Sequence, residues 1–175
     1  MSESAKSLLH DAYHRIREHV QSVADGLSEE ALLWRPTPTS NSIGWLLWHA
    51  ARVQDDHVAQ IAGVEQVWTR EGFYGRFQLP YPPSAHGYGH TAEDVGQFRG
   101  SAALLDEYQN RVHVMVQGYL DTVTDAELAR IVDRSWNPPV TASVRLVSVV
   151  DDCAQHLGQA AYIRGMAEDW SSPEG

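Results

Sequence analysis

The chain has 175 residues, a length that suits one domain with its own hydrophobic core, so residues 1–175 are expected to form a single domain. Thirteen Lys and Arg against 23 Asp and Glu give a net charge of −10. This charge argues against nucleic acid and anionic membranes as partners, because both attract a basic face. The lone cysteine excludes an internal disulfide, and no basic-then-apolar leader opens the chain, so we expect a cytoplasmic location.

Four long helices are predicted from apolar residues that recur every three or four positions, the period of one helix face. They cover 4–24, 41–62, 101–122 and 141–167. Ser40 or Asn41 is expected to cap the second of them, and a break is expected at Gly100 and Ser101. Short helices are predicted to begin after Ser28, Thr91 and Thr124, residues whose side chains can cap a helix.

The intervening segments lack a convincing alternating strand pattern. Paired prolines exclude helix from 130–140, which is expected to be extended. The fold class predicted from these elements is all-α, a four-helix bundle with a long irregular loop between its second and third long helices. That loop, 63–90, is rich in aromatic residues, glycine and proline. Such a long connection either covers a pocket or packs as an irregular arm against the core or a dimer partner.

The residues that point to chemistry lie on the second and fourth long helices. Asp152 and His156 are four residues apart, so both side chains project from one helix face about a turn apart. His49 can supply a third ligand if the two helices are neighbours. Two histidines and one carboxylate form a site compatible with Fe(II), Zn(II), Ni(II) or Mn(II). The alternative is a buried network in which Asp152 pairs with Arg52 or Arg164 and the histidines form structural hydrogen bonds.

Two other features compete with this interpretation. His10 and His14 have the same spacing, but they lie among charged residues and are expected on the solvated surface. Cys153 adjoins Asp152, yet it points about 100° away into the apolar side of its helix, where a neutral core thiol is expected.

Two motifs carry a resemblance to a known family. Residues 41–57 (NSIGWLLWHAARVQDDH) and 151–165 (DDCAQHLGQAAYIRG) resemble the DinB-like superfamily of metalloenzymes. This superfamily includes mycothiol-dependent maleylpyruvate isomerases and bacillithiol-type S-transferases. The resemblance implies an up-down-down-up four-helix bundle, usually dimeric, so a homodimer is expected.

The resemblance also implies a divalent metal held by one histidine of the second long helix and two residues one turn apart on the fourth. His49 and His156 match the family's ligand positions. Asp152 stands where the family most often has histidine, so it is either a carboxylate ligand that changes metal preference or the mark of a degraded site. Metal, when bound, lowers the pKa of a coordinated water or thiol.

The function expected from these features is a metal-dependent S-transferase or isomerase that acts on a small molecule with a low-molecular-weight thiol. Twelve of the thirteen basic residues are arginine, which suggests a GC-rich genome and favours mycothiol as the thiol. Asp56 and Gln159 are candidates for orienting the histidine rings, and His90 in the loop is a candidate base. Two alternatives stay open: a non-catalytic metal- or ligand-binding stress-associated protein, and a structural dimerisation bundle.

Overall fold

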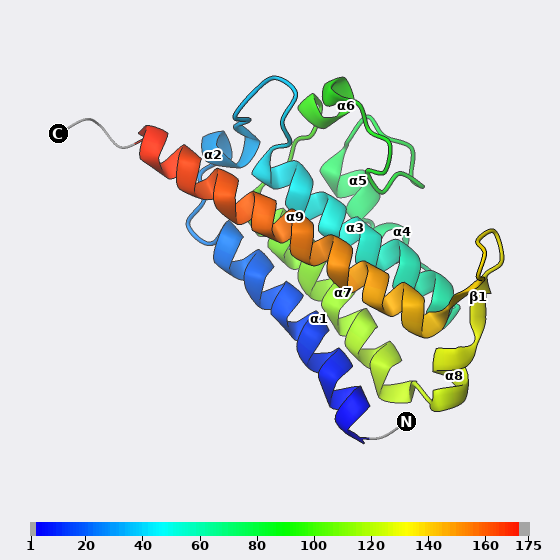
Figure 1. Cartoon of the computed structure of the whole chain (residues 1–175). Helices are drawn as coiled ribbons and strands as arrows, with labels where there is room; N and C mark the ends of the chain where they lie inside the picture. The colour runs from blue at the N-terminus through cyan, green and yellow to red at the C-terminus, as the bar shows by residue number, and fades with distance from the viewer. Residues whose placement is uncertain (1–2, 172–175) are drawn as a thin grey trace.

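The computed structural model of the chain describes residues 3–171, and the side chains of 5–167. Its four long helices are α1 (Glu3–Ala24), α3 (Ile43–Ala62), α7 (Ala102–Thr122) and α9 (Ala142–Ser171). They lie side by side, with α3 against α7 and α9, and α1 against the same two helices. In Figure 1, α1 and α9 run in one direction and α3 and α7 in the other. The predicted all-α fold class is confirmed.

Helix α3 occupies the most enclosed position of the bundle. Sixteen of its 20 residues are buried, because α7 and α9 flank it and the segment after it folds back over its remaining side. Trp48, at 0% exposure, shows how little of the helix reaches solvent. Burial on all sides forces the polar residues of α3 to find partners inside the protein. The polar residues buried on α3 are His49, Arg52, Gln54 and Asp55.

The helix starts follow the predicted capping chemistry, with one correction. The side chains of Ser28, Thr91 and Thr124 cap α2 (Glu29–Leu33), α6 (Ala92–Gly96) and α8 (Asp125–Ala129), and Ser101 caps α7. The cap of α3 is Ser42, whose hydroxyl accepts from the amide of Trp45, and neither Ser40 nor Asn41 has this role. All three side chains can cap a helix, so sequence alone does not select among them.

The segment 63–90 is more ordered than an irregular loop. It contains two short helices, α4 (Val67–Arg70) and α5 (Phe73–Phe77). Its earlier aromatic residues are buried against the bundle, and the members of this group are Trp68, Phe73, Phe77 and Tyr81. Tyr88, near its end, is 88% exposed. The first part of the segment is therefore a packed arm. Its last part, residues 85–90, covers the surface of α3 and is named the covering segment.

Residues 131–140 contain no helix, as the paired prolines predict. Strands β1 (Ile131–Asp133) and β2 (Val140–Thr141) pair antiparallel and form a hairpin beside the start of α9, a pairing that the sequence did not indicate (Figure 1). Strands of three and two residues are too short for an alternating pattern to show in the sequence. Among the described residues, no helix is long and apolar enough to cross a membrane.

Candidate metal centre

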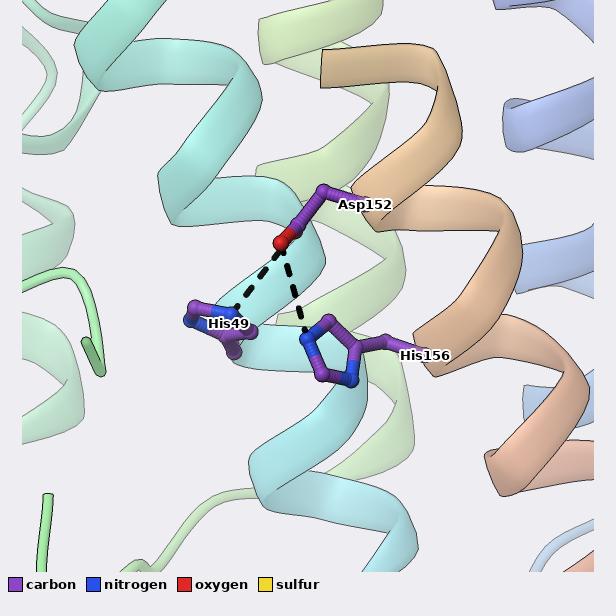
Figure 2. Close-up of side chains that lie close together, drawn as sticks. All are labelled: His49, Asp152 and His156. Atoms are coloured by element: carbon purple, nitrogen blue, oxygen red, sulfur yellow. Dashed lines mark ion pairs between the residues drawn. The ribbon is translucent and has the colours of Figure 1, made fainter. Parts of the chain in front are cut away.

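Three side chains that could hold a metal ion meet where α3 and α9 pack together. His49 comes from α3, and Asp152 and His156 come from successive turns of α9, as Figure 2 shows. Asp152 Oδ2 lies 3.7 Å from His49 Nε2, and Asp152 Oδ1 lies 3.7 Å from His156 Nε2. One ligand atom from each residue lies within 4.8 Å of the other two. The fold thus brings together the three residues proposed as ligands from the sequence.

The ring of His49 is held in one orientation by the segment that covers α3. Its Nδ1–H donates a hydrogen bond to the carbonyl oxygen of His86. A carbonyl only accepts, so Nδ1 carries the proton and the lone pair of a neutral ring lies on Nε2. Trp45 stacks on the face of the His49 ring, with ring centroids 4.9 Å apart. The free lone pair therefore faces Asp152, in the arrangement typical of a metal-binding histidine.

The close approach of this segment requires glycine at position 87. Gly87 has φ +101°, and a Cβ there would lie 2.5 Å from His49 Nδ1 and 3.0 Å from a Trp45 ring carbon. Any other residue would push the segment away from His49. Gly87 thus has a packing role beside the site.

The electrostatics of the triad favour a cation over a simple ion pair. Burial lowers the pKa of His49 to about 4, so the ring is neutral at pH 7. A neutral imidazole cannot neutralise Asp152, and at 3.7 Å the two groups are too far apart for a hydrogen bond. Asp152 Oδ2 is consequently a buried acceptor that no hydrogen bond satisfies. Such an atom between two imidazole nitrogens marks a place for a positive charge.

The residues fit a divalent ion in donor type as well. Neutral imidazole nitrogen and carboxylate oxygen are ligands of Zn(II), Fe(II), Ni(II) and Mn(II), and a three-ligand set leaves positions open. Ligands about 2.1 Å from a tetrahedral zinc are about 3.4 Å apart. The observed separations are somewhat longer, so a bound ion would draw the three side chains inward. His156 and Asp152 are partly exposed and have room to move.

Arg52 and Arg164 do not form the alternative buried network with Asp152. Arg52 donates to Ala85, Gln66, Tyr108 and Asp55. Arg164 donates to the carbonyl oxygens of Ser22 and Val23 at 2.8 and 2.9 Å. Asp152 instead has the two histidines as its close neighbours.

Gln159 lies where a ring-orienting residue is expected. Its Oε1 is 3.3 Å from His156 Nδ1, so it can accept a hydrogen bond from Nδ1–H and leave Nε2 free for an ion. Asp56 has other partners: it accepts from Gln66 Nε2 at 2.8 Å and lies 3.5 Å from His57 Nδ1. The orienting contact to His49 comes from the His86 carbonyl instead.

The candidate base His90 is packed among aromatic rings. Its Nδ1 accepts a hydrogen bond from Trp45 Nε1 at 3.2 Å, and it lies against Trp48 and Tyr81. Burial lowers its pKa, so the ring is neutral at pH 7. Trp45 contacts both His90 and His49, so the Trp45 ring links His90 to the triad.

Of the competing features, His14 is on the surface beside Glu18, as predicted. His10 is half-buried instead, because it contacts Gln117 and Asp121 of α7. Cys153 is buried, and its thiol lies 3.5 Å from the Ala50 carbonyl. Burial raises the pKa of this thiol well above its usual value, so it is a neutral core group.

A small pocket opens beside the triad. Its volume is about 150 Å³, room for several waters. It is bounded by His49 and Asp152, by three further polar residues of the bundle, by the covering segment and by two valines: His57, Arg145, Ser148, His86, Tyr88, Val53 and Val149. The covering segment therefore forms one wall of the pocket.

The fold and the triad define an all-α protein with a candidate divalent-metal centre. The sequence model of a known family, mycothiol S-transferase, matches residues 8–168. The chain belongs to this DinB-like family. A conserved protein of Enterococcus faecalis has a similar crystal structure, with a TM-score of 0.86 and 28% identity over 93% of this chain and 96% of that one. None of the curated proteins compared with the chain matches it.

Sequence reasoning missed the contribution of the covering segment. The atom that orients His49 is a backbone carbonyl. Every residue has such a carbonyl, so the residue type does not reveal where it points. Gly87, whose φ is positive, was the available signal of a close backbone approach.

Proposed function

We propose that the chain is a divalent-metal-dependent S-transferase that joins a low-molecular-weight thiol of the mycothiol type to a small electrophile. The observation that carries this proposal is the triad of His49, Asp152 and His156, with His49 neutral and oriented by the His86 carbonyl. Membership of the mycothiol S-transferase family supports the choice of thiol.

His49 and His156 would hold the ion through Nε2, and Asp152 through its carboxylate. When bound, such an ion lowers the pKa of a thiol so that thiolate exists near neutral pH. In the transfer, the S–H bond breaks and its proton passes to water. The sulfur lone pair then forms the S–C bond, and the leaving group departs with its bonding electrons. The neutral donors and the single carboxylate leave the site with a net positive charge, which favours thiolate over thiol.

Conjugation assays test the proposal. The purified protein, loaded with Zn(II), Ni(II), Fe(II) or Mn(II), is mixed with mycothiol and a panel of chromogenic electrophiles. We expect metal-dependent turnover that His156→Ala abolishes. His14→Ala is the matched control, because it removes an exposed histidine outside the site and should leave turnover unchanged.

Metal binding without turnover across the panel would favour a non-catalytic binding protein, and the absence of metal binding would favour a structural bundle with a degraded site. The homodimer that the resemblance implies stays a prediction, and light scattering after size-exclusion chromatography tests it.

A further inference from the structure

A buried arginine lies one turn beyond His49 on α3. Arg52 is 0% exposed, and its Nε–H donates to the carbonyl of Ala85 at 3.0 Å. Its Nη1 donates to Gln66 at 2.8 Å, and its guanidinium lies 5.0 Å from the ring centre of Trp68. One side chain thus contacts both the beginning and the end of the segment 63–90.

Asp55 secures the beginning of the same segment. Its carboxylate accepts from the backbone amides of Val67 and Trp68 at 2.8 and 2.7 Å, and from the Tyr108 hydroxyl at 2.8 Å. The Asp55 interactions are complete without the Ala85 contact. Arg52 alone, within this cluster, extends to the part of the segment that covers His49.

Ala85 directly precedes the residue whose carbonyl orients the ring of His49. The backbone from Ala85 to Gly87 is short, and Gly87 packs against His49 Nδ1, so a shift of Ala85 displaces the His86 carbonyl as well. We propose that Arg52 is a positioning residue of the metal centre: by holding the Ala85 carbonyl, it sets the His86 carbonyl that keeps His49 Nε2 free for an ion. This inference rests on the proposed metal-binding function.

Stability alone gives a poor reason for a buried arginine at this position. Removing a guanidinium from water is costly, and well-packed apolar residues often replace buried ion pairs without loss of stability. What an apolar side chain cannot supply is a directed N–H group fixed on a helix one turn from His49. Polar groups that orient a ligand typically contribute about 10- to 100-fold in metal affinity.

Two substitutions test the role. Arg52→Met keeps much of the side-chain volume and removes every donor, and Arg52→Lys keeps the charge beside Asp55 but lacks the Nε–H that reaches Ala85. Both are measured by Zn(II) titration of the folded protein against a competing chelator. We expect about 10-fold weaker binding for each. If Arg52→Met fails to fold, Arg52→Lys carries the test.

Tyr108→Phe is the matched control. It removes two hydrogen bonds from the same buried cluster, to Asp55 and from Arg52, but leaves the Ala85 contact intact. We expect it to lower the stability of the protein with little change in Zn(II) affinity. An equal loss of affinity in Tyr108→Phe would reduce Arg52 to a structural residue and overturn the proposal.

A second readout needs no metal. The nitrogen chemical shifts of the His49 ring, recorded on the apo protein at pH 8, report which nitrogen carries the proton. The wild type should show Nδ1–H, and the Arg52 variants should shift toward Nε2–H. Unchanged shifts and unchanged affinity would refute the inference. Failure of the wild type to bind Zn(II) would instead refute the proposed function, while the ring tautomer would still decide the role of Arg52.

Discussion

Asp152→Asn tests whether the carboxylate of the triad is a metal ligand. The substitution keeps the shape of the side chain and removes its charge from between two histidine rings, each 3.7 Å away. Apparent zinc affinities of four-ligand sites are about 10–16 kcal/mol, or about 3 kcal/mol for each ligand. Loss of one ligand therefore weakens binding about 100-fold, and an amide oxygen that still coordinates would reduce the effect to about 10-fold.

The stability of the apo protein should respond differently. Asp152 Oδ2 has no hydrogen bond to lose, so replacing it should change the free energy of unfolding by less than about 1 kcal/mol. Chelator competition with Zn(II) at pH 7.5 measures the affinity, and urea titration measures the stability. Asp151→Asn is the control, because Asp151 lies one residue earlier, is exposed and pairs with Gln155. Wild-type affinity in Asp152→Asn, or an equal loss in Asp151→Asn, would refute the assignment of the ligand.

Three further predictions follow from the same contacts. The pKa of His49 falls from 6.5 in the unfolded chain to about 4 in the folded one, so the unfolded state binds more protons between these values. The apo protein should therefore lose up to about 3 kcal/mol of stability from this residue as the pH drops from 6.5 to 4, and urea titrations should show a smaller loss for His49→Gln. Cys153→Ala should leave Zn(II) affinity unchanged and lower the stability by about 1–2 kcal/mol, because it opens a small cavity in the core; loss of metal would contradict the buried position of the thiol. Gly87→Ala should weaken Zn(II) binding and cost about 1–3 kcal/mol, since alanine is strained at φ +101° and its Cβ meets His49; wild-type affinity would show that the covering segment does not orient the ring.

The long helices could be predicted because each spans many turns, so that the apolar period repeats often enough to be recognised. Their caps could be predicted because Ser and Thr side chains accept hydrogen bonds from the first amides of a helix. The exception is α3, where three adjacent residues can all cap. Helices α4 and α5 span four and five residues, little more than one turn, and carry no period of their own. The β hairpin escaped prediction because pairing of two and three residues depends on the turn between them.

The proximity of His49 to Asp152 and His156 could be predicted from helix spacing together with a family pattern. The family pattern indicated that two helices distant in sequence are neighbours in the fold. The orientation of His49 could not, because a backbone carbonyl of the covering segment provides it. The contacts of Arg52 with this segment could not be predicted either, because they join residues 14 and 33 positions apart in the chain.

The most direct test of a metal centre is anomalous diffraction from crystals grown with Zn(II), recorded on both sides of the zinc absorption edge. We predict one strong difference peak between His49 Nε2, His156 Nε2 and the carboxylate of Asp152, about 2.1 Å from each. Zinc peaks only at surface carboxylates, with none between these three residues, would contradict the central claim that the chain is built around a metal-binding triad.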